Sequence, residues 1–150
     1  MENYDPQVAQ RVWKRVLDGP AREEMPQLQA LIIGEWQDAA TYLQLSRRLQ
    51  GSAAQRLRKM FEEEQAHGAC LKGIYSLVTG ERPRVKAPPV SQDSVKAILR
   101  RCYGREMQCL AAYEQWSGHR EYGPVFARLA QQEREHCRIL LEILGSLPGK

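Results

Sequence analysis

The feature that most constrains the fold is the motif Glu-x-x-His, which occurs twice. The two copies are Glu64-Gln65-Ala66-His67 and Glu133-Arg134-Glu135-His136. Residues three apart lie on one face of an α-helix, whereas on a strand they point to opposite faces. In a helix, each motif therefore places a carboxylate and an imidazole where both can bind one metal ion. Two of the three histidines of the chain are used in this way.

Apolar residues around both motifs recur at spacings of three and four, which is the period of a helix. No segment shows the alternation of a strand. We therefore predict an all-α fold in which residues 26–145 form a four-helix bundle. The expected boundaries are Pro26 at the start of the first helix, Gly51 at its end with Ser52 as the cap of the second, Gly80 at the end of the second, and Ser91 or Asp93 at the start of the third.

Two further segments complete the organisation. Residues 6–18 carry apolar side chains at helical spacing and predict an N-terminal accessory helix. Residues 81–90 contain three prolines and predict an extended connection. A length of 150 residues is typical of one compact domain, so we expect residues 1–150 to form a single domain.

Composition argues against several classes of function. The net charge is +4, but the basic residues are scattered and have acidic neighbours, so solvated helix faces are favoured over nucleic-acid binding. We find no apolar run of membrane-spanning length and no signal peptide, and we expect a cytoplasmic protein without a membrane partner. No cysteine pair has the C-x-x-C spacing of a zinc ribbon. The cysteines are expected to be free thiols: Cys70, Cys102, Cys109 and Cys137.

The two halves of the chain repeat each other. Glu35 is followed by Gln two residues later and by Tyr42 seven residues later, and Glu106 is followed by Gln and by Tyr113 at the same spacings. The distance from this glutamate to the Glu of the following motif is 29 residues in the first half and 27 in the second. The chain therefore has the pattern of a duplicated helical hairpin.

Six residues of this repeat fall on apolar helix faces, which makes a metal site the best interpretation. Four carboxylates that face one core repel one another, and their burial is costly unless cations compensate. Surface contacts on charged helices, the alternative, do not explain why both pairs lie on core faces. Carboxylate and imidazole ligands favour two iron ions, or else two manganese ions, over structural zinc. The six predicted ligands are Glu35, Glu64, His67, Glu106, Glu133 and His136.

Residues near the motifs receive lesser roles. Glu63 and Glu135 lie off the apolar face and are expected to be solvent-facing or to support the ligands. His119 lies in a turn and is expected to be exposed. Trp36 and Trp116 are interpreted as packing residues.

This ligand pattern resembles the ferritin-like superfamily and, within it, the rubrerythrin-like proteins, over roughly Gln27 to Leu144. The resemblance implies a ferritin-like four-helix bundle in which residues 81–90 form a long crossover between the second and third helices. It implies that Glu35 and Glu106 are ligands from the first and third helices. It also implies that Tyr42 and Tyr113 hydrogen-bond to ligand carboxylates.

The sequence departs from rubrerythrins at two points. Rubrerythrins carry a rubredoxin-like iron site built from cysteine pairs, which this sequence lacks. They also tend to have a further Glu one turn after the third-helix ligand, where this chain has Cys109. An external electron donor protein would therefore be required.

The resemblance implies a di-iron oxidoreductase that reduces peroxide or oxygen. Three alternatives remain open: oxidation and handling of ferrous iron, a dimanganese catalase-like site, and a structural bundle in which metal only supports the fold. We also expect a homodimer, because the predicted N-terminal accessory helix at 6–18 has more apolar residues than a detached surface helix needs.

Overall fold

The computed structural model describes Gln7, residues 24–86 and residues 89–148. Four helices make up most of this part of the chain: α2 (Met25–Arg48), α3 (Gly51–Thr79), α4 (Val95–Trp116) and α5 (Gly123–Ser146). The described residues contain no strand, so the prediction of an all-helical fold is confirmed for them. Apart from Gln7, the predicted accessory helix at 6–18 lies outside the described residues.

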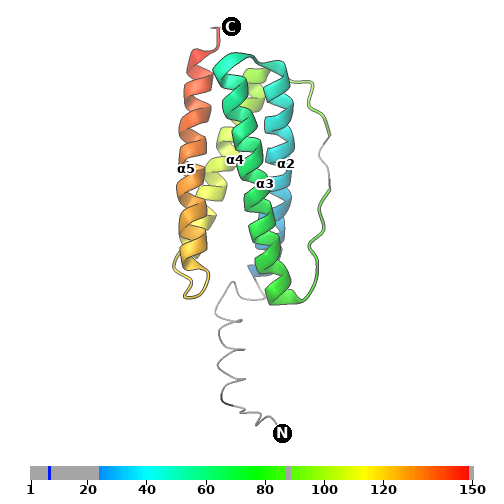
Figure 1. Ribbon diagram of the computed structural model, residues 1–150, viewed down its shortest axis with the longest axis vertical. Helices are drawn as coiled ribbons and strands as arrows, with labels where there is room; N and C mark the ends of the chain where they lie inside the picture. Colours follow the sequence, from blue (N-terminus) through cyan, green and yellow to red (C-terminus); the bar gives the residue numbers. More distant parts are fainter. Residues whose placement is uncertain (1–6, 8–23, 87–88, 149–150) are drawn as a thin grey trace.

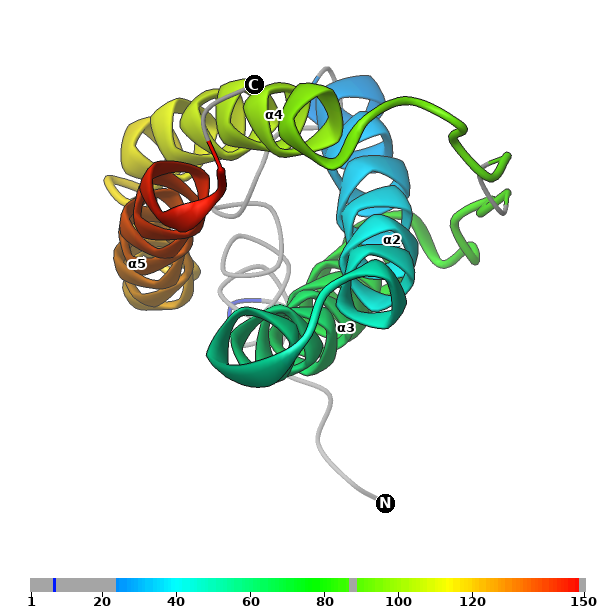
Figure 2. The same ribbon diagram turned by 90° about the horizontal axis from the view of Figure 1, so that it is seen from above.

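The four helices form two hairpins that lie against each other. Helix α2 packs along α3, and α4 packs along α5. The hairpins meet where α2 lies beside α4 and α3 lies beside α5, as the view along the bundle shows (Figure 2). Both motif-bearing helices, α3 and α5, therefore turn one face toward the same interior.

Two apolar clusters fill the bundle, one at each end. One cluster includes Ile32, Leu71 and Phe126, and the other includes Leu57 and Leu140. The layer between them contains the glutamates and histidines of the repeat, so each apolar face is interrupted at mid-helix by acidic side chains. None of the described helices is long and apolar enough to span a membrane.

The boundaries of α3 differ in part from the prediction. Gly80 ends the helix in the left-handed conformation (φ +73°), as expected. Gly51 also has a positive φ of +65°, but it begins α3 instead of closing α2. Ser52 is therefore not the cap, and the residue in the cap position, Gln50, makes no side-chain capping bond. The chain reverses here through the freedom of Gly51 and not through a capping side chain.

The start of α4 lies slightly later than predicted. Neither Ser91 nor Asp93 is the cap; it is Ser94, whose Oγ accepts a hydrogen bond from the backbone N–H of Ala97 at 3.2 Å. Ser94 has the extended backbone that a cap requires, with ψ 151°. Ser91 instead accepts a hydrogen bond from the backbone N–H of Asp93, which stabilises the turn before the helix.

The described residues between α3 and α4 run along the outside of α2 (Figure 1). Near the start of α2, Gln29 Nε2 donates to the carbonyl oxygen of Arg84 at 2.5 Å. At the end of α2, Arg48 Nη1 donates to the carbonyl oxygen of Asp93 at 2.9 Å. The connection is thus attached to both ends of α2.

Candidate metal centre

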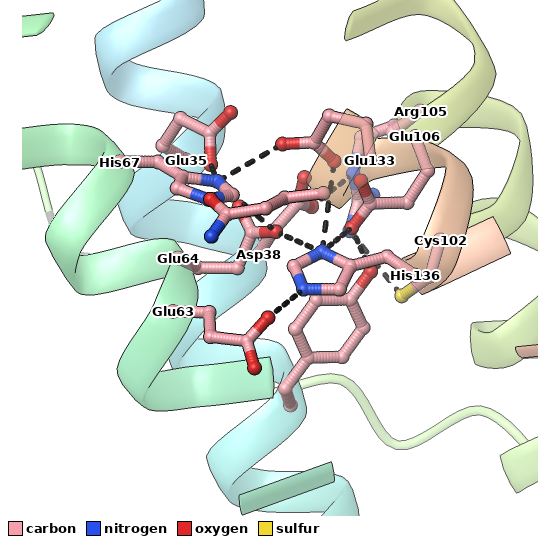
Figure 3. A network of polar contacts seen from close by, with 12 residues as sticks. Glu35, Asp38, Glu63, Glu64, His67, Cys102, Arg105, Glu106, Glu133 and His136 are labelled. Atoms are coloured by element: carbon pink, nitrogen blue, oxygen red, sulfur yellow. Dashed lines mark hydrogen bonds and ion pairs between the residues drawn. The ribbon is translucent and has the colours of Figure 1, made fainter. Parts of the chain in front are cut away.

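All six residues that the repeat singles out lie together in the layer between the two apolar clusters (Figure 3). Each is at most 2% exposed. Every helix contributes: α2 and α4 supply one glutamate each, and α3 and α5 supply one Glu-x-x-His motif each. The residues are Glu35, Glu64, His67, Glu106, Glu133 and His136.

The six side chains form two overlapping groups, each able to hold a metal ion. Within each group the ligand atoms lie within 4.8 Å of one another. Glu64 and Glu133 belong to both groups, so two adjacent four-ligand positions share two carboxylates. The first group consists of Glu35, Glu64, His67 and Glu133, and the second of Glu64, Glu106, Glu133 and His136.

Both histidines turn Nδ1 toward the carboxylates. His67 Nδ1 lies 3.0 Å from Glu133 Oε1 and 3.5 Å from Glu35 Oε2. His136 Nδ1 lies 2.7 Å from Glu64 Oε1. The two rings are stacked with their centroids 5.7 Å apart. Nδ1 is therefore the nitrogen that each imidazole can offer to a metal ion, while Nε2 faces outward.

Several buried polar atoms of the cluster have no hydrogen-bond partner, which is expensive in a protein interior. They include both carboxylate oxygens of Glu64 and one oxygen of each of the other three glutamates. His136 Nδ1 is also without one, although Glu64 Oε1 is close to it. Cations placed between these atoms would satisfy them together, so the donor set fits a metal centre. Carboxylate and imidazole donors bind several divalent metal ions, iron and manganese among them.

The electrostatics of the cluster also favour cations. Burial, with the charge of Glu133 in addition, raises the pKa of Glu35 to about 8. Burial alone would lower the pKa of His67, but hydrogen bonds and charges from Glu133 and Glu35 outweigh it and raise this pKa to about 10. In the same way, Glu133 and Glu63 overcome the burial of His136 and raise its pKa to about 9. The carboxylates of Glu35, Glu133 and Glu63 thus favour positive charge on both imidazoles.

Two tyrosines hold the unshared glutamates in place. Tyr42 Oη donates to Glu106 Oε1, and Tyr113 Oη donates to Glu35 Oε1. Each tyrosine therefore reaches the glutamate of the opposite hairpin. Burial raises the pKa of both phenols well above the ordinary value, so both remain protonated donors. Each bond occupies one carboxylate oxygen and leaves the other for the centre.

Two outer residues contact the histidines from the side away from the cluster. Glu63 Oε2 lies 2.8 Å from His136 Nε2, so of the two roles considered for Glu63 the structure favours support of a ligand. Gln132 Oε1 accepts a hydrogen bond from His67 Nε2, a role that sequence reasoning missed. The available signal was the repeat itself, because each residue immediately precedes the glutamate of its motif.

A buried ion pair next to the cluster was also missed. Asp38 is 1% exposed, and Arg105 Nε donates to its Oδ1 at 2.5 Å. Burial raises the pKa of Asp38 to about 6, although the charge of Arg105 opposes the shift. The apolar faces alone offer no such cation. Arg105 lies beside one of them, and its long side chain reaches Asp38 while it stays partly exposed to solvent.

His119 and the four cysteines, which the sequence analysis also considered, lie outside the two ligand groups. The prediction that His119 is exposed is wrong: its ring packs near Trp116 and Phe126, and its Nε2 lies 3.4 Å from a Glu24 oxygen. Cys109 is buried, and burial raises the pKa of its thiol, with the nearby acidic charges adding to the effect. It belongs to neither ligand group. All four cysteines are free, as predicted.

Comparison of this chain with protein-family models, with curated proteins and with solved structures finds no match. The interpretation of function therefore depends on the geometry and chemistry of the buried cluster. That geometry can hold metal ions, and the choice of element has to be argued from the ligands.

Proposed function

We propose that the chain is a rubrerythrin-like di-iron oxidoreductase of the ferritin-like superfamily, which reduces peroxide or oxygen with electrons from an external donor protein. The observation that carries this proposal is the membership of Glu64 and Glu133 in both ligand groups. Two shared carboxylates are expected of a dinuclear centre, whereas a mononuclear site has no need of a second group. The segment between α3 and α4 is attached to both ends of α2, which supports the role of its proline-rich part as the crossover of such a bundle.

Charge supports two ions in preference to one. The ligand set contains four carboxylates and two imidazoles that are neutral when they bind metal. Two divalent cations neutralise four carboxylates. One divalent cation would leave the second ligand position without a metal ion, and its carboxylates would be compensated only by the protonated histidine.

The chemistry follows from the ligands and their surroundings. A bound iron pair would supply the one-electron redox steps that peroxide or oxygen reduction requires. Tyr42 and Tyr113 orient the two unshared carboxylates. The apolar clusters on both sides separate this layer from bulk water along the bundle axis.

An open cleft beside the centre agrees with a small substrate. The cleft has a volume of about 680 Å³ and lies between α3 and α5, where Glu63 and Gln132 line it. These are the two residues that contact the histidines from outside. Peroxide and oxygen are small enough to approach the histidines by this side. The remaining lining residues, all on α5, are Arg128, Gln131, Arg134, Glu135 and Arg138.

The proposal is tested by the metal content of protein purified without oxygen and reconstituted with ferrous iron. We expect about two irons per chain, lost in both Glu64→Ala and Glu133→Ala because each glutamate serves both positions. Circular dichroism checks that the variants remain helical, and peroxide consumption with an added reductant is then measured. A well-folded wild-type protein that takes up no metal above trace would exclude the proposal. Two tightly bound manganese ions with peroxide disproportionation would favour the dimanganese alternative.

Ferrous iron oxidation is the second candidate, and Cys109 favours it. Where a rubrerythrin tends to have a further glutamate, this chain has a buried thiol outside both ligand groups. Iron storage requires a large shell, whereas an oxidoreductase needs none. The native mass in solution separates the two: a homodimer agrees with the first proposal, and a large closed assembly agrees with the second.

A further inference from the structure

The two outer contacts of the histidines are made by equivalent residues of the repeat. Glu63 precedes the first motif and Gln132 precedes the second, each by one position. Each reaches across to the histidine of the other motif: Glu63 to His136 at 2.8 Å, and Gln132 to His67. Figure 3 shows Glu63 on the outer side of His136, with its carboxylate directed at the ring nitrogen.

These contacts decide which nitrogen of each histidine can bind metal. When Nε2–H donates to an outer oxygen, the lone pair of the neutral ring lies on Nδ1, which faces the carboxylates. The strength of the outer bond differs between the two sites. A carboxylate forms a charge-assisted hydrogen bond and makes the imidazole a stronger electron donor, whereas an amide oxygen does so more weakly.

In other respects the two positions have matched ligands. Each group contains three glutamates and one histidine, and each unshared glutamate is held by one tyrosine. Asp38, whose equivalent in the repeat is Cys109, is a buried acidic residue that also breaks the symmetry. Its charge is compensated by Arg105 at 2.5 Å. The exchange of Glu63 for Gln132 is therefore the main uncompensated difference between the two sites.

We infer that the two metal positions are unequal in affinity and that the position at His136 fills first, because Glu63 is charged and Gln132 is neutral. The inference rests on the proposed dinuclear site and deepens it. Glu63 is suited to this role because its side chain is only 28% exposed, which limits screening by water. Its nearest cationic group, Lys59 Nζ, is 3.9 Å away at an exposed position and competes weakly with His136.

The test is stepwise titration of metal-free protein with Co²⁺, followed by absorbance and calorimetry. Wild-type protein should bind two ions in two steps whose affinities differ by about tenfold or more. Glu63→Gln should weaken the tighter step by about 10- to 100-fold, so that the two steps converge. Gln132→Glu should strengthen the weaker step and make the steps converge at the higher affinity.

Two further measurements assign the steps. Glu106→Ala should remove the tighter step and Glu35→Ala the weaker one, because each glutamate belongs to one group only. In the exchanged protein, Glu63→Gln with Gln132→Glu, this assignment should be reversed. A merely structural effect of either substitution would change both steps alike and would not reverse their order.

The results of these titrations either support or overturn the inference of unequal sites. Two steps of equal affinity in wild-type protein, or constants that neither substitution changes, would overturn this inference and leave the dinuclear site intact. Absence of any Co²⁺ binding by folded wild-type protein would overturn the proposed function as well. Thermal unfolding of the metal-free variants serves as the folding control, and Gln132→Glu provides a gain of affinity that misfolding cannot imitate.

Discussion

At the scale of single residues, the buried glutamates are suited to binding metal and not to stabilising the metal-free fold. Glu106 illustrates this: it is fully buried, one oxygen accepts a hydrogen bond from Tyr42, and the other has no partner. Without a cation, such an atom is stabilised neither by water nor by the protein. The glutamates should therefore destabilise the metal-free fold and contribute favourably only when metal is bound.

The substitution Glu106→Gln tests whether the buried glutamates destabilise the metal-free protein. The amide keeps an oxygen for Tyr42 and removes one of four crowded charges, so the metal-free protein should gain about 1–3 kcal/mol in unfolding free energy. The same change should weaken metal binding at the His136 position. Urea denaturation with and without a chelator measures both effects. Glu35→Gln, which preserves the Tyr113 bond in the other group, is the matched variant. Destabilisation of the metal-free protein by both substitutions would contradict the argument.

At the scale of helices, packing between α2 and α3 depends on a glycine. A Cβ atom added at Gly68 would lie 2.9 Å from Trp36 Nε1, so a larger residue would collide with the indole. The indole is also covered by Lys72, whose Nζ lies 4.3 Å from the ring centroid. Gly68 follows His67 and Trp36 follows Glu35, so a collision between Gly68 and Trp36 would also disturb residues of the cluster.

Gly68→Ala should therefore lower the unfolding free energy by about 1–3 kcal/mol through overpacking. Gly73→Ala is the control on the same helix, since a Cβ atom there meets nothing within 4 Å. It should raise the unfolding free energy by about 1 kcal/mol, because alanine is the better helix former. Thermal unfolding of the two variants makes the comparison. Equal stabilisation of both would show that the Trp36 contact is not tight.

Helical periodicity predicted the elements well and their ends less well. The four helices follow from apolar residues at spacings of three and four, which depend only on local geometry. The cap of α4 is Ser94 and not the predicted Ser91 or Asp93. Gly51 begins α3 instead of ending α2. Several neighbouring residues can cap a helix equally well, and packing of the hairpin selects among them.

At the scale of the whole molecule, the centre lies where the two hairpins meet. Each ligand group takes residues from both hairpins, so a bound ion would join α2 and α3 to α4 and α5. Metal binding should therefore stabilise the association of the hairpins in particular, besides the individual helices.

Saturation with metal should raise the unfolding free energy of the whole chain. At a free metal concentration 100 times the dissociation constant, the gain is about 2.7 kcal/mol for each site. Denaturation of wild-type protein with Mn²⁺ or with a chelator measures this gain. The double variant Glu64→Ala with Glu133→Ala, which lacks both shared ligands, should show no gain. An equal gain in this variant would place the stabilising ions elsewhere.

The sequence by itself determined the helical fold, the internal repeat and the six candidate ligands, because each of these depends on residue types and their spacing along the chain. Only the tertiary structure decided which helices face each other, and with that the sharing of Glu64 and Glu133 between two groups. It also decided the contacts of Glu63 and Gln132 with the histidine of the opposite motif. The hydrogen bonds that the tyrosines make between the two hairpins join residues 64 and 78 positions apart, and no local pattern specifies which of them will meet.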